Sequence, residues 1–418
     1  MKKIWIMNHY ATDMFENKGG RHFWFAKNLI KLGYNPTVFC ANTFHQKKEE
    51  IDLGKNKYKL MHSDNIPFIF IKTKASVSNG IDRIKNMVYF YFNLLNVSKK
   101  LIKKGDKPDF ILASSVHPLT LVAGIKLGKK FNIPVICEVR DLWPEAIFTF
   151  NKAKENSLLG KLLVRGEYWI YKNADALIFT KEGDIDYIKE KKWDIQQYGK
   201  IDLNKAHYIN NGVDVEAFNS SINQNILEDN DLDKKKFNVV YVGAIRPVNN
   251  VNNLLETAIK LKEYDDIQFL IYGDGNQREE LEQKVKNENL LNIKFKGFVN
   301  KKYIPYILSK SSVNILNYSS DQYNWTRGNS SNKLFEYLAS GKPVISTVKM
   351  GYSIIYKYNC GFELKKNNPE ELAKAILNIR NMDLSIYNEY STNAKIAAEY
   401  FDFKILTQKL ISVMESMV

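Results

Sequence analysis

The sequence predicts an α/β protein built from two doubly wound domains, each with a parallel sheet, that face a central cleft. Three observations lead to this prediction: the length of 418 residues, the alternation of short apolar runs with helical patterns, and a polar segment near the middle of the chain. A chain of this length exceeds what one hydrophobic core supports. We therefore expect one set of alternating strands and helices in each half.

The strands are expected where short runs rich in Val, Ile and Phe are bounded by polar residues. In the first half these runs are Lys3–Met7, Thr37–Ala41, Phe68–Lys72, Asp109–Ser114, Val135–Val139 and Ala176–Thr180. In the second half they are Asn238–Val242, Gln268–Tyr272, Ile293–Lys296, Val313–Leu316 and Val344–Thr347. Apolar residues three to four apart predict helices at Arg21–Leu32, Thr120–Lys130, Asn252–Glu263, Gln277–Glu288 and Lys301–Ser309.

The segment from Asp214 to Lys236 is polar and acidic, which is typical of a linker or surface loop. The expected domains are residues 1–213 and 214–401, and we expect a helix over residues 402–418 to pack back onto the first domain. No run reaches the roughly 20 apolar residues that span a bilayer. The first apolar run is also too short for a signal peptide and is expected to form the first strand. The scattered cysteines suit a reducing cytoplasm, where we expect the protein.

Positive charge is concentrated in the first half of the chain. Residues 1–213 carry 35 Lys and Arg against 21 Asp and Glu, whereas residues 214–418 carry 26 against 25. A basic surface of this kind suits nucleic acid, anionic lipid or a phosphorylated substrate, although a generally Lys-rich composition explains it too. The three cysteines are scattered and form no CxxC pair, which argues against a disulfide framework.

The most informative motif spans residues 330–345 and reads as a loop, a short helix, a glycine and a strand. Ser330 or Ser331 suits the first cap of the helix, and Gly341 suits its end. Free N–H groups at such a helix start bind anions, and Lys333 lies in the first turn. Glu336, one turn on, could bind sugar or ribose hydroxyls. These features fit a nucleotide sugar, although similar helices are common without any ligand.

Loops after the strands of the first half hold further candidates. Gly19 and Gly20 precede a helix, where their small size would let the backbone approach a ligand. Arg140 could bind phosphate and Asp141 could orient a hydroxyl, unless the two form only an ion pair. His117 follows another strand, where a structural role is the alternative.

Three strand ends in the second half carry glycine. Gly243 is followed by Arg246, which could neutralise a diphosphate, and Gly273 ends the next strand. Phe298 follows a third such strand, at a place where a nucleotide base could lie. Together these loops indicate one nucleotide pocket.

Motifs for other chemistry are missing from the sequence. We find no HExxH motif and no Cys/His cluster, so no metal site and no cofactor are expected. The chain also has no GxxxxGK[ST] phosphate loop and no Gly-x-Ser-x-Gly nucleophile elbow.

Taken together, these motifs resemble the retaining glycosyltransferases of family 4, which have the two-domain GT-B fold. The resemblance rests on Gly19-Gly20, Asn211–Asp214, Tyr241–Gly243, Gly273–Gly275, Lys296–Val299 and Asn332–Ile345. The segments Arg140–Glu145 and Ser331–Tyr337 look most like the bacterial branch that acts on N-acetylated sugars in surface polysaccharides such as capsule, O-antigen and exopolysaccharide.

The resemblance implies roles for individual residues. Glu336 matches the second glutamate of the family's Glu-x7-Glu motif, which binds the ribose of the donor. Backbone N–H groups around Ser330 to Lys333 would hold the diphosphate, and Gly20 would approach the same phosphates from the other domain. Arg246 lies in a loop that usually supplies positive charge to the leaving group.

The chain departs from the family pattern at several positions. The first motif glutamate is replaced by Gly328, so that Arg327 or Asn329 would have to contact the donor sugar. The family's usual Arg and Lys in the preceding glycine loop fall at Ala244 and Asn249.

The implied reaction moves an N-acetylated hexosamine or deoxyhexosamine from a nucleotide diphosphate donor, expected to be UDP-linked, to a lipid-linked saccharide. The resemblance implies retention without a metal, with the leaving phosphate taking the acceptor proton and Asp141 orienting a hydroxyl. The run Met87–Phe92 and the lysines after it read as a helix at an anionic membrane surface, or else as a core helix.

Two other functions stay open at this point. A sugar-nucleotide 2-epimerase of the same fold would bind the same donor but would turn over without an acceptor. A nucleic-acid-binding protein would explain the basic first half, but the sequence contains no recognisable nucleic-acid module.

Overall fold

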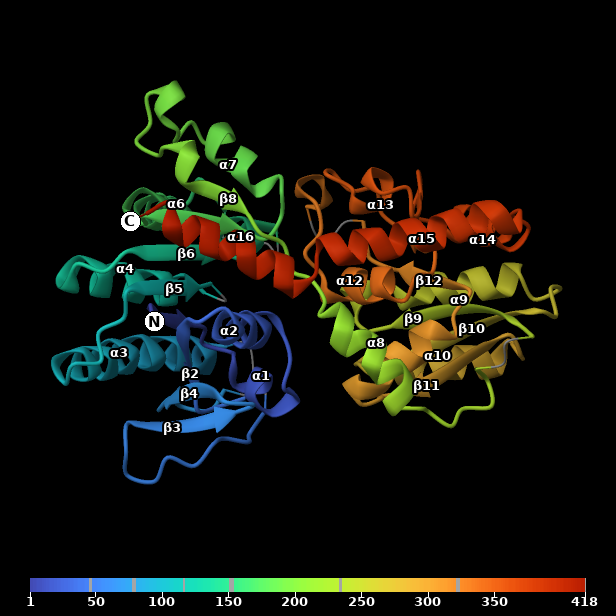
Figure 1. Ribbon diagram of the computed structural model, residues 1–418. Coiled ribbons are helices and arrows are strands. Elements are labelled where there is room, and N and C mark those ends of the chain that lie inside the picture. The colour runs from blue at the N-terminus through green and yellow to red at the C-terminus, as the bar shows by residue number, and fades with distance from the viewer. Residues whose placement is uncertain are drawn as a thin grey trace. The chain divides into compact units, whose positions relative to one another are not determined.

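The computed structural model describes residues 1–44, 47–76, 80–115, 117–149, 154–232, 235–320 and 324–417. It divides into two compact units, Met1–Asn210 with Phe403–Val418 (unit 1) and Asn211–Asp402 (unit 2). Each unit is a sheet covered by helices, as Figure 1 shows. The predicted fold class of two Rossmann-like α/β domains is confirmed.

Unit 1 is built on an eight-stranded sheet in the order β3-β4-β2-β1-β5-β6-β7-β8. The strands are β1 Lys3–Met7, β2 Asn35–Ala41, β3 Tyr58–Ser63, β4 Ile66–Ile71, β5 Phe110–Ser114, β6 Val135–Val139, β7 Ala176–Phe179 and β8 Ala206–Tyr208. All neighbouring pairs are parallel except β3, which runs antiparallel to β4 at one edge. The sequence pattern predicts neither β3 nor β8, because edge strands lack a continuous apolar run.

The helices of unit 1 cover both faces of this sheet. They are α1 Thr12–Asn17, α2 Arg21–Lys31, α3 Ile81–Lys103, α4 Pro118–Phe131, α5 Trp143–Thr149, α6 Leu158–Asn173, α7 Asp184–Glu190 and α16 Phe403–Glu415. The C-terminal helix α16 packs against α2, with the rings of Phe25 and Phe403 5.7 Å apart. On the other face α3 packs against α4, and α4 against α6.

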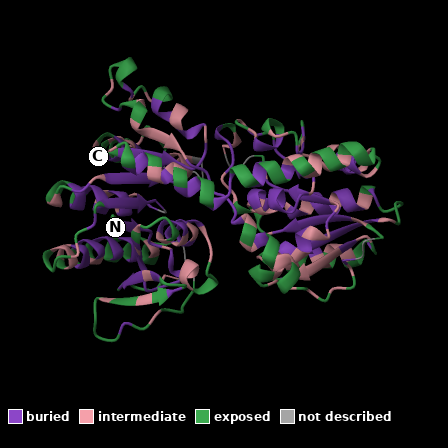
Figure 2. Cartoon of the chain, in the orientation of Figure 1, coloured by how far each residue is buried: buried purple, intermediate pink, exposed green. Residues whose placement is uncertain are grey.

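Unit 2 has a six-stranded, fully parallel sheet in the order β11-β10-β9-β12-β13-β14. Its strands are β9 Phe237–Val242, β10 Ile267–Tyr272, β11 Ile293–Gly297, β12 Val313–Leu316, β13 Val344–Ser346 and β14 Gly361–Glu363. Its helices are α8 Val215–Gln224, α9 Val251–Lys260, α10 Arg278–Asn287, α11 Ile304–Ser309, α12 Asn332–Ala339, α13 Ile354–Lys357, α14 Pro369–Arg380 and α15 Leu384–Tyr400. Figure 2 shows that the strands are largely buried while the helices expose their outer sides.

The segment Asp214–Lys236, predicted as a linker, begins with helix α8 instead. The Asp214 carboxylate accepts a hydrogen bond from the Ala217 amide at 2.7 Å and so caps this helix. Phe218 is buried beneath it. The prediction is wrong here because one cap and one anchoring side chain are enough to order a polar helix.

In each sheet the strand order reverses at one place. In unit 1 this place lies between β1 and β5, and in unit 2 between β9 and β12. Loops that leave the carboxyl ends of two such strands diverge, and ligands of open α/β sheets bind there. The candidate sites are therefore expected in the loops after these four strands.

None of the described helices is long and apolar enough to cross a membrane. Among the residues that the structure describes, no group of three or more acidic, His or Cys side chains is placed to hold a metal ion.

Close backbone packing explains two glycines at the carboxyl edge of unit 2. A Cβ atom on Gly273 would lie 1.8 Å from the Gly243 carbonyl oxygen, and one on Gly275 would lie 2.2 Å from the Ile245 carbonyl oxygen. The loops after β9 and β10 thus touch through their main chains. These two glycines are required by loop packing alone, whether or not a nucleotide binds nearby.

Gly273→Ala is expected to lower the free energy of unfolding by about 1–3 kcal/mol or more, because the two loops must separate. Urea denaturation followed by circular dichroism measures the change. Gly166→Ala is the matched control, since a Cβ there meets nothing within 4 Å in helix α6. An equally small effect of both substitutions would contradict the packing argument.

Candidate functional site

The switch point of unit 2 is held together by asparagines. Asn317, just after β12, donates hydrogen bonds to the carbonyl oxygens of Asn249 and Asn250, both at 2.7 Å. Asn249 also donates to the Ala244 carbonyl oxygen at 2.7 Å. These bonds fix the loop after β9 against the loop after β12. The sequence analysis does not identify Asn317, because an Asn after a strand carries no distinctive pattern.

Lys333, in the first turn of α12, reaches this loop. Its Nζ donates to Asn249 Oδ1 at 3.2 Å and lies 5.0 Å and 4.7 Å from the ring centres of Tyr241 and Tyr318. A Cβ on Gly243 would lie 2.9 Å from the Tyr241 hydroxyl and 3.0 Å from Lys333 Cδ, so a larger residue would make both side chains shift. The structure thus brings together Lys333, Asn249 and Gly243, as a shared site requires.

The surroundings of Lys333 are neutral. Within the described residues its neighbours are an amide and two aromatic rings, none of which carries a negative charge. Burial lowers the pKa of Lys333 from 10.5 to about 7. A cation placed in this way is stabilised by any anion that binds next to it.

The start of α12 leaves backbone donors available. Ser331 occupies the cap position, but its side chain makes no capping hydrogen bond. Instead, Asn329 Oδ1 accepts from the Ser331 amide at 2.7 Å, and the Ser330 carbonyl accepts from Asn211 at 2.6 Å. The predicted position of the cap is confirmed, whereas a capping hydrogen bond from the Ser331 side chain is absent. A helix of eight residues begins with uncapped N–H groups, led by Asn332.

Gly328 has a backbone conformation that favours glycine strongly. Its φ of 98° with ψ of −168° is nearly forbidden to residues with a side chain. This conformation accounts for the absence of a glutamate at this position. The neighbouring Arg327 is buried, with 6% of its surface exposed.

Three other residues predicted to contact the donor sugar nucleotide are partly or fully exposed. Glu336 has 18% of its side chain exposed and lies 3.7 Å from the Lys301 ammonium. The side chain of Arg246 is exposed, and Phe298 is 77% exposed. The structure does not place Arg246 or Phe298 in contact with Lys333.

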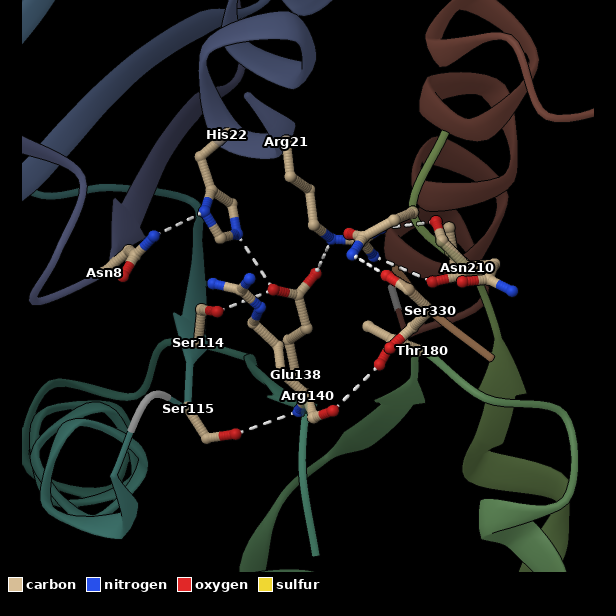
Figure 3. A network of polar contacts seen from close by, with 12 residues as sticks. Asn8, Arg21, His22, Ser114, Ser115, Glu138, Arg140, Thr180, Asn210 and Ser330 are labelled. Carbon is tan, nitrogen blue, oxygen red and sulfur yellow. Dashed lines mark hydrogen bonds and ion pairs between the residues drawn. The ribbon is translucent and has the colours of Figure 1, made fainter. Parts of the chain in front are cut away.

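In unit 1 the central feature is the buried carboxylate of Glu138 on β6. It accepts hydrogen bonds from Arg21 Nε at 2.6 Å, His22 Nε2 at 2.9 Å and Ser114 Oγ at 2.6 Å. Asn8 contacts the other ring nitrogen of His22 at 2.9 Å. Figure 3 shows how the five side chains converge from four separate segments of unit 1.

Charge pairing keeps this carboxylate ionised. Burial alone would raise the pKa of Glu138, but Arg21 and His22 outweigh burial and hold that pKa well below its usual range. Arg21 also donates to the carbonyl oxygens of Ile209 and Asn210, at the end of the unit. A charged residue inside the apolar run 135–139 is the sequence signal that identifies this network, and the sequence analysis overlooks it.

Two histidines meet at the switch point of unit 1. His117, at the cap position of α4, lies with its Nε2 2.6 Å from Nδ1 of His9, which follows β1. The His9 ring also stacks on Phe90 at 4.2 Å. Burial and, to a smaller extent, Arg83 lower the pKa of His117 to about 3, so it stays neutral and pairs as a hydrogen-bonding group. His9 is absent from the residues predicted from the sequence.

The remaining predicted residues of unit 1 lie at the same carboxyl edge of the sheet. The backbone of Arg140 accepts a hydrogen bond from Thr180 at 3.0 Å, and its side chain is half-buried. Asp141 is exposed. Gly19 precedes α2, and Gly20 caps that helix with a φ of 94°, which favours glycine.

Glu138→Gln is expected to lower the free energy of unfolding by about 3–5 kcal/mol, because it leaves Arg21 buried without its counter-charge. The depressed pKa of Glu138 means that this contribution is present above its usual pKa of 4.5 and is lost as the pH falls. Urea titrations at pH 7 and at acidic pH measure both effects. Asp106→Asn, which removes a surface pair with Lys3, should change stability by less than about 1 kcal/mol.

Lys333→Met is expected to stabilise the ligand-free protein at neutral pH by removing a poorly solvated charge. Because the pKa of Lys333 is lower in the folded than in the unfolded chain, the wild-type protein gains stability as the pH rises from about 7 toward 10.5. The difference between the two proteins should therefore shrink over that range. Lys286→Met, at an exposed position, is the control, and a constant difference for Lys333→Met would contradict the assignment.

Two family descriptions match this chain, one in each unit. Residues 25–217 match "Glycosyltransferase Family 4", and residues 223–397 match "Glycosyl transferases group 1". The second match covers all six strands of unit 2, whereas the first begins within α2 and leaves out β1 and the loop that holds Gly19 and Gly20.

Among curated proteins the chain is 26% identical to a putative teichuronic acid biosynthesis glycosyltransferase, TuaH, of Bacillus subtilis over 54% of both chains. It is 27% identical to 2-deoxystreptamine N-acetyl-D-glucosaminyltransferase of Niallia circulans over 29% of this chain and 30% of that protein. The chain thus spans about half the length of the first relative and less of the second.

The fold is also that of HepE from Anabaena, solved in complex with UDP-glucose. The TM-score is 0.65 with 16% identity, over the full length of both chains. This chain is therefore similar to family 4 glycosyltransferases in unit 1 and to group 1 glycosyltransferases in unit 2, and its fold is the GT-B fold.

Proposed function

We propose that this protein is a glycosyltransferase that uses a nucleotide diphosphate sugar as donor. The observation that carries the proposal is Lys333, a partly buried cation with neutral neighbours beside the uncapped start of α12. A diphosphate bound there would receive hydrogen bonds from backbone N–H groups and would supply the missing negative charge. Both group 1 and family 4 descriptions support the same reaction class.

The donor is UDP-linked in this proposal. HepE, which shares the fold, is solved with UDP-glucose, and the Niallia circulans relative is named as an N-acetyl-D-glucosaminyltransferase. These names favour an N-acetylated hexosamine or deoxyhexosamine as the sugar. Glu336 would bind the ribose, one helical turn beyond Lys333.

Lys333 would act on the leaving group. When the bond between sugar and diphosphate breaks, negative charge grows on the diphosphate, and a nearby cation with fixed N–H donors stabilises it. The family pattern has a lysine at the position of Asn249. In this chain Asn249 instead accepts a hydrogen bond from Lys333, so the positive charge comes from α12. We infer that the reaction retains configuration without a metal, and that the leaving phosphate takes the acceptor proton.

The acceptor is a lipid-linked saccharide of a bacterial surface polysaccharide in this proposal, which the name of the Bacillus subtilis relative supports. Asp141 is the residue that would orient its hydroxyl, since it is exposed at the carboxyl edge of unit 1. The basic first half would bring the enzyme to an anionic membrane surface on the inner face of the plasma membrane.

UDP is expected to raise the thermal midpoint, because a ligand that binds only the folded state stabilises it by about 2.7 kcal/mol at 100 times its Kd. Glu336→Ala should weaken UDP binding about tenfold or more, which corresponds to about 1.4 kcal/mol. Differential scanning fluorimetry with UDP, GDP, ADP and TDP measures both. Glu279→Ala, at an exposed position of α10, should bind UDP like the wild type.

A protein that none of the four nucleotides stabilises would contradict the proposed donor site. Loss of UDP-sugar in the absence of any acceptor, with formation of an isomeric UDP-sugar, would favour the 2-epimerase over the transferase.

A further inference from the structure

An apolar cavity of about 240 Å³ lies in unit 1 between α4, α5 and α6. It begins at the ends of β5 and β6, where Asp141 contributes to its wall. From there it is lined by Val122 of α4 and Trp143 of α5, and it reaches Leu162 and Trp169 of α6. Its wall is almost entirely hydrocarbon and aromatic.

The buried acid in this wall, Glu167, does not make the cavity polar. Glu167 accepts hydrogen bonds from the hydroxyl groups of Tyr171 and Tyr187, both at 2.8 Å. Burial raises the pKa of Glu167 to about 7, so its carboxyl group tends toward the neutral form. The cavity therefore favours an apolar occupant over water.

Exposed leucines surround the outer end of the cavity. On α6, Leu158 is 89% exposed, Leu159 54% and Leu162 66%, and Trp169 is 37% exposed. Several large apolar side chains together on one helix face mark a surface that contacts an apolar partner. Leu162 belongs both to this surface and to the cavity wall, so the two are continuous.

The packed helices on this side of the sheet are rich in positive charge. The three packed helices α3, α4 and α6 hold eleven Lys and Arg residues and two acidic ones. One of the cations, Lys129 of α4, lies 5.7 Å from the ring centre of Trp169. Apolar side chains together with positive charge are complementary to a lipid that carries phosphate.

We propose that this cavity holds the isoprenoid chain of the lipid phosphate that carries the acceptor. The identification of the lipid as the acceptor's carrier rests on the proposed function. The binding of an isoprenoid phosphate rests only on the cavity, the leucines and the basic helices. The chain would lie along the cavity between its Asp141 end and Leu162.

The test is calorimetric titration of the full-length protein with farnesyl phosphate, below its micellar concentration. Saturable binding is expected, and Leu162→Glu should weaken it about tenfold or more by placing a charge in the cavity wall. Leu291→Glu is the matched control, because it puts the same charge at an exposed leucine of unit 2, outside both the cavity and the leucine surface of α6. This control should change the affinity less than about twofold, because an added surface charge is largely screened by salt.

Equal weakening by both substitutions, or inorganic phosphate binding as tightly as farnesyl phosphate, would overturn the proposal. Both leucines are exposed, so the variants should fold, and their thermal midpoints check this. UDP stabilisation is measured on the same samples. Failure of the farnesyl titration with an intact UDP response removes the lipid inference alone, whereas loss of the UDP response in the wild type removes the proposed function.

Discussion

The way in which buried positive charge is compensated distinguishes the two units of this protein. In unit 1, Arg21 and His22 are buried around Glu138, and the network is complete without a ligand. In unit 2, Lys333 is partly buried among an asparagine and two tyrosine rings, and burial lowers its pKa to about 7. The first arrangement holds segments of a domain together, whereas we propose that the second is completed by a bound anion. The proposed chemistry depends on this difference.

Both arrangements lie where the topology brings loops together. The strand order reverses next to β1 in unit 1 and next to β9 in unit 2, and the loops that follow these strands carry His9 and Asn249. The family pattern has a lysine at position 249, but in this chain Lys333 comes to Asn249 from α12. The loss of the lysine at position 249 is thus balanced by Lys333, which keeps an ammonium group beside the start of α12.

Much of the fold could be predicted from the sequence, because buried parallel strands are continuous apolar runs with sharp ends. Lys3–Met7 and Val135–Val139 have the predicted bounds. The edge strand β3 could not be predicted, since nearly all of its side chains are exposed or only partly buried. Helix α8 could not be predicted either, because its stability comes from Asp214 and Phe218. Within the candidate site the sequence identified Lys333 and Gly243 but not their neutral surroundings. Pairs such as His9 with His117 depend on tertiary contacts that no local spacing reveals.

The most direct test of the central claim is the number of protons taken up when UDP binds. Isothermal titration calorimetry at pH 8, in two buffers with different ionisation enthalpies, measures that number. A lysine with a pKa of about 7 is mostly neutral at this pH, and a bound diphosphate should restore its proton. The account predicts uptake of about one proton by the wild type and none by Lys333→Met. Binding of UDP without proton uptake by the wild type would contradict it.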